Sequence, residues 1–251
     1  MTSERGFALI TALWLIAAVS TMVGLQVAAA RLGQQTSFNR ITLARGRWAA
    51  EACLAIVQAR WRAQRLADTA SIDLGASTRC HWQVDDPGAR INVNTADPDV
   101  LTRAVADSAL ALALLGARRV SLFVSVEQLP AHYRSLFTVD GPGTVNLNRA
   151  PEAVLSVLPG VTDEAVERIT GRRNLGRPIT SLDELGSLLS PAARASLLEH
   201  YADLARITTV SPSQLVVTSQ GWVEGSAPHA TIETVAVPLP DRLAVIRRRM
   251  W

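Results

Sequence analysis

The sequence predicts an α+β fold in which a long N-terminal helix packs on a small antiparallel sheet that carries a large helical insertion. Three observations predict it. An uncharged apolar stretch at the N-terminus continues into an amphipathic helical pattern. β-Branched residues alternate near residue 80 and again after residue 206, and helical segments that begin at prolines fill the chain between these regions.

Composition limits the class of protein. Of the 251 residues, 48% are hydrophobic, and 25 basic side chains, all arginine, stand against 22 acidic ones. Such a chain is neither disordered nor a disulfide-stapled miniprotein, because the residues after Ala30 suffice for one large or two small domains. A net charge of +3 produces only a weak electrostatic field around the protein and is therefore weak evidence for nucleic-acid binding.

Residues 7–30 are predicted to span a membrane. The stretch from Phe7 to Ala30 has no charged residue, and at about 1.5 Å per residue a helix of this length exceeds the ~30 Å hydrocarbon core of a bilayer. A cleaved signal peptide is the alternative, but the run exceeds the usual apolar length of about 7 to 15 residues. Four arginines between residues 31 and 47 favour a cytoplasmic domain by the positive-inside rule.

The first residues resemble a processing site. Arg5-Gly6-Phe7 before an apolar helix is similar to the start of type IV pilins and type II secretion pseudopilins. This resemblance implies that a prepilin peptidase cuts between Gly6 and Phe7 and that Phe7 is methylated. The fifth mature residue, usually glutamate in these families, is here Thr11. A missing glutamate is the peculiarity of the K-type minor pseudopilin, whose place at the pseudopilus tip leaves no neighbouring amine to neutralise.

Helical spacing continues to about Leu66, with Gly33 and Gly46 as candidate bends, and two separate helices are the alternative to one. Residues 68–79 are small and polar, which predicts a loop. Alternation at 80–84 and 91–93 around the turn 85–88 predicts a β-hairpin.

The middle of the chain contains an internal repeat with a period of 54 to 56 residues. Ile91–Leu101 matches Val145–Leu155, and Phe123–Leu129 matches Ile179–Leu185. Each copy has an Asn-x-Asn motif that ends a short strand and a proline that begins a helix. Capping boxes are predicted for Ser125 with Gln128 and for Ser181 with Glu184. Helices are predicted at 98–115, 151–158, 163–173, 182–189 and 191–200.

Strands are predicted again at 215–218, 221–223, 232–237 and 243–246, and these should join the hairpin near residue 80 as antiparallel neighbours. The predicted organisation is a leader (1–6), a membrane segment (7–30), the rest of the helix (31–66), a hairpin (67–94), a helical insertion (95–206) and C-terminal strands (207–251).

Leu158–Thr162 resembles a helix-hairpin-helix, a module that binds DNA phosphates through backbone amides. A membrane-anchored DNA receptor is therefore a competing hypothesis. The DNA-binding form continues with neutral or basic residues, whereas Asp163 and Glu164 follow here and repel phosphate. Three arginines later in the helix are predicted to form a solvated face, and we expect no nucleic-acid partner. They are Arg168, Arg172 and Arg173.

The repeated block, the hairpin and the Ser181–Leu185 ending look like the helical domain of the K-type minor pseudopilin of type II secretion, although the chain is somewhat short for that family. This resemblance implies a pilin-like fold with a SAM-like, helix-hairpin-helix-like insertion. It implies a tip subunit in the inner membrane, with a periplasmic domain, that starts pseudopilus assembly for protein export. The implied partners are the I- and J-type minor pseudopilins, prepilin peptidase and the inner-membrane secretion platform. A type IV pilus minor pilin is the alternative.

No catalytic motif occurs, and the four histidines lack ligand spacing, so we expect no enzymatic activity. In an oxidising periplasm Cys53 and Cys80 form either a disulfide or two buried thiols. Calcium binding in the family makes four carboxylates candidate ligands, although a role at a helix start suffices for two of them, and we expect no cofactor. The candidates are Asp85, Asp86, Asp97 and Asp99.

Overall fold

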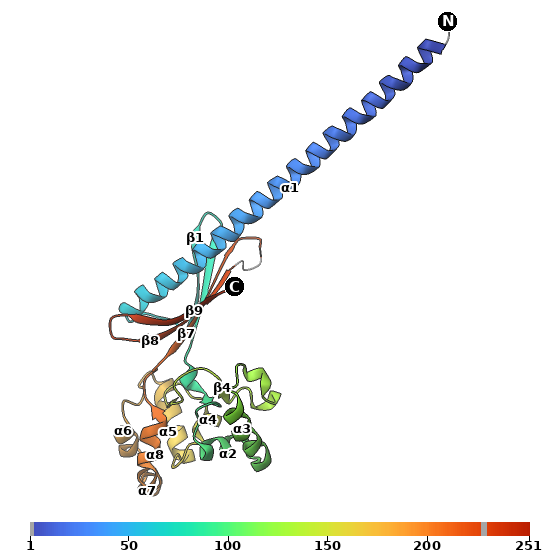
Figure 1. Ribbon diagram of the computed structural model, residues 1–251. Coiled ribbons are helices and arrows are strands. Elements are labelled where there is room, and N and C mark those ends of the chain that lie inside the picture. Colours follow the sequence, from blue (N-terminus) through green and yellow to red (C-terminus); the bar gives the residue numbers. More distant parts are fainter. Residues whose placement is uncertain (1–2, 227–229) are drawn as a thin grey trace.

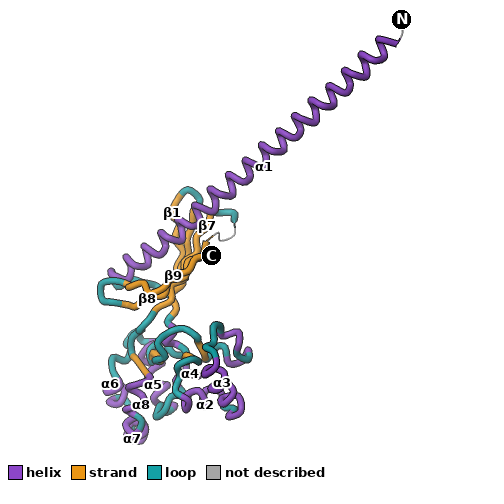
Figure 2. Tube along the Cα trace, viewed as in Figure 1, coloured by secondary structure: helices purple, strands orange, loops and turns teal. Residues whose placement is uncertain are grey.

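The computed structural model describes residues 3–226 and 230–251, with side chains from residue 10 onward. One continuous helix, α1 (Ser3–Arg62), runs from the N-terminus and ends on one face of a five-stranded antiparallel sheet (Figure 1). A helix-rich unit lies beyond the sheet, at the end away from the N-terminus (Figure 2). The predicted α+β fold is therefore confirmed, and the helix is one piece to residue 62.

The sheet has the strand order β1-β2-β7-β8-β9. β2 and β7 pair antiparallel at its centre, although more than a hundred residues separate them in the sequence. The helical unit is thus inserted between two neighbouring strands. The strands are β1 (Thr69–Gly75), β2 (Thr78–Asp85), β7 (Leu215–Val223), β8 (Ala230–Pro238) and β9 (Leu243–Met250).

Small residues let α1 lie close to the sheet. A Cβ atom at Gly221 of β7 would lie 2.1 Å from the carbonyl oxygen of Gly46, so only glycine fits there. Ala49 and Ala50 are buried at the same crossing. Farther along, Trp61 Nε1 donates to the carbonyl of Leu239 at 2.7 Å and ties the end of α1 to the turn between β8 and β9.

The helical unit contains fourteen short elements with their own buried core, which shares no member with the core under α1. They are η1 (Pro87–Ala89), β3 (Ile91–Asn92), α2 (Pro98–Val105), α3 (Ser108–Val120), η2 (Val126–Gln128), η3 (Ala131–Tyr133), β4 (Phe137–Thr138), β5 (Val145–Asn146), α4 (Glu152–Leu155), α5 (Asp163–Asn174), α6 (Leu182–Ser187), α7 (Pro191–Glu199), α8 (Tyr201–Ile207) and β6 (Thr208–Thr209).

The repeat is visible in the structure. We call residues 91–138 the first copy and residues 145–209 the second. Each is closed by two short parallel strands, β3 with β4 and β5 with β6. The second asparagine of each Asn-x-Asn motif holds a distant segment: Asn94 exchanges two hydrogen bonds with Phe123, and Asn148 does the same with Ile179.

Several elements differ from the sequence prediction. The hairpin is β1 with β2, so residues 68–79 are largely strand and not loop, and Ile91 pairs inside the helical unit. The predicted helix 98–115 is broken because Ala106 adopts a left-handed conformation and Asp107 caps a new helix, α3. Residues 201–207 form an additional helix, α8.

Of the two predicted capping boxes, the first is confirmed and the second is confirmed only in part. The first, Ser125 with Gln128, is complete. In the second, Ser181 accepts the Glu184 N–H, but the Glu184 carboxylate accepts the N–H of Thr180, one residue earlier than expected.

Candidate assembly surface

The first half of α1 is an exposed apolar rod. Its most apolar 18-residue window has a mean hydropathy of 1.8 and no buried residue, and α1 is the one helix in the described part of the chain that is long and apolar enough to cross a membrane. Thr11 lies exposed on this rod. Gly6 and Phe7 belong to its helical backbone, and the side chain of Phe7 lies outside the described part.

Closer to the sheet, one face of α1 combines arginine with exposed apolar side chains around an open hollow of about 590 Å³. Trp48 is 76% exposed there, and Leu43 is 47% exposed. Glu51, at the edge of the hollow, forms an ion pair with Arg248 of β9. Like the exposed rod, this face of α1 presents apolar side chains to solvent.

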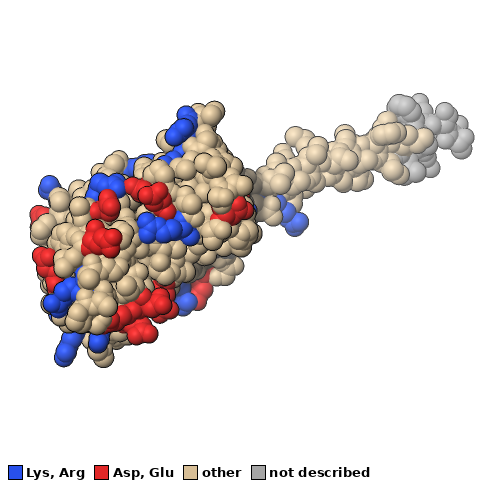
Figure 3. All heavy atoms as spheres, turned by 90° about the horizontal axis from the view of Figure 1, so that it is seen from below, with Lys and Arg blue, Asp and Glu red and all other residues tan. Residues whose placement is uncertain are grey.

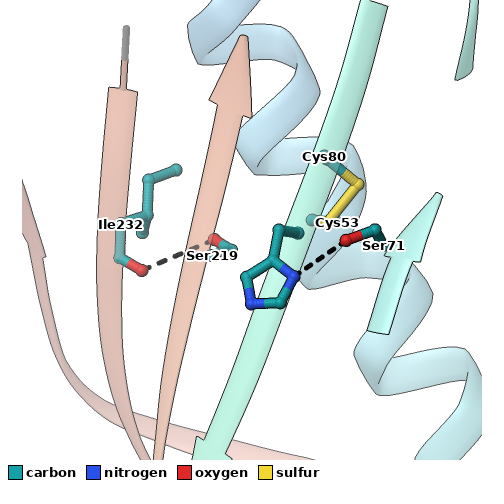
Figure 4. The surroundings of a disulfide bond; sticks show 6 residues. Cys53, Ser71, Cys80, Ser219 and Ile232 are labelled. Atoms are coloured by element: carbon teal, nitrogen blue, oxygen red, sulfur yellow. Dashed lines mark hydrogen bonds between the residues drawn. A yellow bond between two sulfur atoms is a disulfide. The ribbon is translucent and has the colours of Figure 1, made fainter. Parts of the chain in front are cut away.

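A disulfide joins α1 to β2. Cys53 and Cys80 are fully buried with Cα atoms 5.9 Å apart, and their sulfur atoms are bonded (Figure 4). Helix and strand meet here because the small face of α1 crosses the sheet beside Gly221. The bond therefore fixes the helix to the sheet covalently.

Asp85 and Asp86, two of the candidate calcium ligands, already have protein partners. Asp86 is buried after β2, where it accepts hydrogen bonds from the Gly88 N–H and from Asn146 Nδ2, at 2.8 and 2.7 Å. Burial raises the pKa of Asp86 despite these bonds. Asp85 pairs with Arg90 at 3.4 Å. Both carboxylates thus serve the junction between the sheet and the helical unit.

Asp97 and Asp99 lie at the start of α2. The Asp97 carboxylate caps the helix through the Asp99 N–H and binds Arg206 at 2.7 Å, and the hydrogen bond from Arg206 lowers the pKa of Asp97. Within the described residues, no group of three or more His, Cys, Asp or Glu side chains is arranged to hold a metal ion. Asp97 therefore serves as the N-cap of α2 and as the partner of Arg206, and Asp99 contributes its backbone N–H to that cap.

The Leu158–Thr162 hairpin is covered by α7. Gly160 has φ +69°, and a Cβ atom there would lie 2.7 Å from the Ser196 carbonyl and 2.9 Å from His200 Cβ. After the turn, Thr162 caps α5, and the Glu164 carboxylate accepts bonds from the N–H and hydroxyl of Ser190, which lower its pKa. The turn is packed against protein and its helix start is acidic, an arrangement unsuited to phosphate.

The arginines predicted to form a solvated face partly serve another purpose. Arg172 binds Glu184 at 2.6 Å, and Arg173 donates to the carbonyl of Ala150, so two of the three arginines tie the second copy together. In the view from below, arginines and carboxylates are interspersed without a continuous basic band on that face (Figure 3). Sequence reasoning missed these ties because their partners are backbone carbonyls and residues far along the chain.

Comparison with known proteins supports the same architecture. No protein-family model and no curated protein matches the sequence. The chain has a pilin-like fold. It superposes on a chain of the GspK-GspI-GspJ complex from the type 2 secretion system of enterotoxigenic Escherichia coli, with a TM-score of 0.53 and 11% identity. The match covers 90% of this chain and 99% of the other, so the helical unit is part of the shared fold.

Proposed function

We propose that the chain is a K-type minor pseudopilin of a type II secretion system, a subunit that lies at the pseudopilus tip and starts its assembly. One observation carries the proposal. A continuous helix leaves the sheet as an exposed apolar rod, and a large helical unit lies at the opposite end of the molecule (Figure 1). The fold similarity to a chain of the GspK-GspI-GspJ complex supports it.

In this proposal the precursor is held in the inner membrane by residues 7–30, cut between Gly6 and Phe7, and methylated at Phe7. The folded part lies in the periplasm. The arginines after the span oppose this orientation, but large domains are translocated largely regardless of flanking charge. Thr11 suits a first subunit, because a carboxylate in the membrane without a partner amine would be costly.

The proposed partners are the I- and J-type minor pseudopilins, the secretion platform of the inner membrane and prepilin peptidase. The exposed rod and the Leu43 to Trp48 face of α1 would contact neighbouring subunits, as apolar surface exposed in an isolated protein does when it is an interface. The subunit acts by binding, and we expect neither enzymatic activity nor a cofactor.

The test is the intact mass and N-terminal sequence of the full chain recovered from membranes that contain a prepilin peptidase. We expect a chain that begins at methylated Phe7 and retains the apolar segment. Gly6→Val should remain unprocessed, whereas the matched control Gly24→Ala, where an added Cβ would meet nothing within 4 Å, should be cut normally. A chain that begins after Ala30, or one left uncut, would contradict the proposal.

Co-purification distinguishes the remaining alternative. The processed chain should be retained by I- and J-type minor pseudopilins and not by the minor pilins of a type IV pilus. The opposite preference would assign it to the pilus.

A further inference from the structure

The first copy of the repeat exposes three apolar side chains at positions where the second copy has only one. Val120, Leu122 and Val124 are 89%, 63% and 82% exposed. The 56-residue offset between Ser125 and Ser181 aligns them with a glycine, a proline and a threonine of the second copy, namely Gly176, Pro178 and Thr180. Since both copies keep the same framework, that framework does not require the apolar side chains of Val120 and Val124.

The backbone of this segment is extended and partly unpaired. Ser121 and Ser125 have β conformations, and both backbone groups of Phe123 bond to Asn94. Because successive residues of an extended chain face opposite ways, Leu122 and Val124 face outward. Within the described part of the chain, the Leu122 N–H and the Val124 carbonyl have no hydrogen-bond partner. The second copy has Pro178 in place of Leu122 and so lacks this donor.

Val124 also borders a cleft of about 360 Å³ between the helical unit and the face of the sheet opposite α1. Val126 and Val216 give it apolar walls. Its charged lining residues are three carboxylates and one arginine: Asp85 pairs with Arg90, while Asp140 and Glu233 pair with Arg247, which lies outside the lining, at 3.3 to 3.4 Å. Three carboxylates and one guanidinium group therefore line the cleft, which favours a cationic side chain there.

We propose that residues 121–125 and the adjoining cleft bind an extended segment of another protein, one that alternates apolar with polar residues and carries a basic side chain. Alternate side chains of an extended ligand repeat every 7 Å or so, as Leu122 and Val124 do. The two unpaired backbone groups supply the hydrogen bonds by which such segments add to an exposed edge. The proposal does not depend on the assembly role, because α1 contributes nothing to this surface.

The test is fluorescence anisotropy of two labelled nine-residue peptides with the full chain in detergent. One peptide alternates threonine with valine around a central arginine, and the other has glutamate at the centre. We expect the arginine peptide to bind at least tenfold more tightly. The double variant Leu122→Ser and Val124→Ser should weaken that binding at least tenfold.

The matched control is Leu175→Ser with Leu198→Ser, which removes two apolar side chains that are 74% and 60% exposed elsewhere on the helical unit. It should bind as the unaltered chain does. Leu122→Pro, which keeps an apolar side chain but removes the N–H, should also weaken binding. The proposal is overturned if neither peptide binds, if the glutamate peptide binds as well, or if the two double variants behave alike.

Discussion

The two copies of the repeat share a framework and differ in what covers it. In both, an asparagine holds a distant extended segment, and an arginine closes the same loop by donating to a carbonyl: Arg118 to Ala96, and Arg173 to Ala150. The turn between helices is exposed in the first copy and packed under α7 in the second. The shared bonds therefore define the fold, and the two copies differ in how their turns and extended segments are covered.

The largest loss of stability is expected when Asn148 or Asn94 is replaced. Asn148 makes three hydrogen bonds to the backbone of Ile179 and Val210, whereas Asn94 makes two to Phe123. Asn148→Ala leaves three backbone groups without partners and should cost about 4 kcal/mol, against about 2 kcal/mol for Asn94→Ala. Urea unfolding followed by circular dichroism measures both. Equal losses would mean that the third bond adds nothing.

The turns should respond in opposite directions. Gly160 and Ala106 both have positive φ, +69° and +53°. Gly160→Ala adds left-handed strain and a clash with α7, for a loss of about 3 kcal/mol. Ala106→Gly relieves strain at an exposed turn and should stabilise by up to about 1 kcal/mol, after the entropy of glycine is subtracted.

Thermal unfolding of the two turn variants measures the contrast. If both variants destabilise equally, α7 does not crowd the second turn.

The smallest effect concerns pH. Hydrogen bonds from Thr180 and the charge of Arg172 lower the pKa of Glu184 below its ordinary 4.5, whereas Gln128 in the first copy does not titrate. A lowered folded pKa stabilises fully above pH 4.5 and loses this contribution as the pH falls through the folded value. In the Glu184→Gln variant the free energy of unfolding should therefore fall less steeply as the pH decreases below 4.5.

The expected change is small because the carboxylate is solvated. Gln128→Glu is the matched variant in the first copy, and its free energy of unfolding should fall more steeply as the pH decreases. Stability measured between pH 3 and 6 checks both variants, and parallel curves for Glu184→Gln and the unaltered chain would contradict the assignment.

The sequence predicted the framework well and the junctions poorly. The repeat, the apolar helical stretch and the strands after residue 206 have strong local patterns, and all three appear in the structure, although the strands predicted at 215–218 and 221–223 form the single strand β7. Residues 69–75 were predicted as loop, because a short edge strand of small polar residues carries little hydrophobic alternation. The break at Ala106 was missed because alanine rarely adopts positive φ.

The candidate site was predictable only where chemistry is local. The apolar pattern of residues 7–30 lies in consecutive residues and can be recognised from the sequence alone. Contacts such as Glu51 with Arg248, or Arg149 with Asp68 at 2.6 Å, join residues far apart along the chain and have no local signature. The exposed residues 120–124 appear as a surface only when the helices around them are placed.

The bond between Cys53 and Cys80 gives the molecule a mechanical property. A load applied along α1 passes into β2 through a covalent link, and β2 leads directly into the helical unit. The path from the N-terminal end of α1 to the helical unit therefore does not depend only on the noncovalent contacts between α1 and the sheet. A force that pushes or pulls the exposed part of α1 is therefore transmitted to the helical unit through the disulfide and β2.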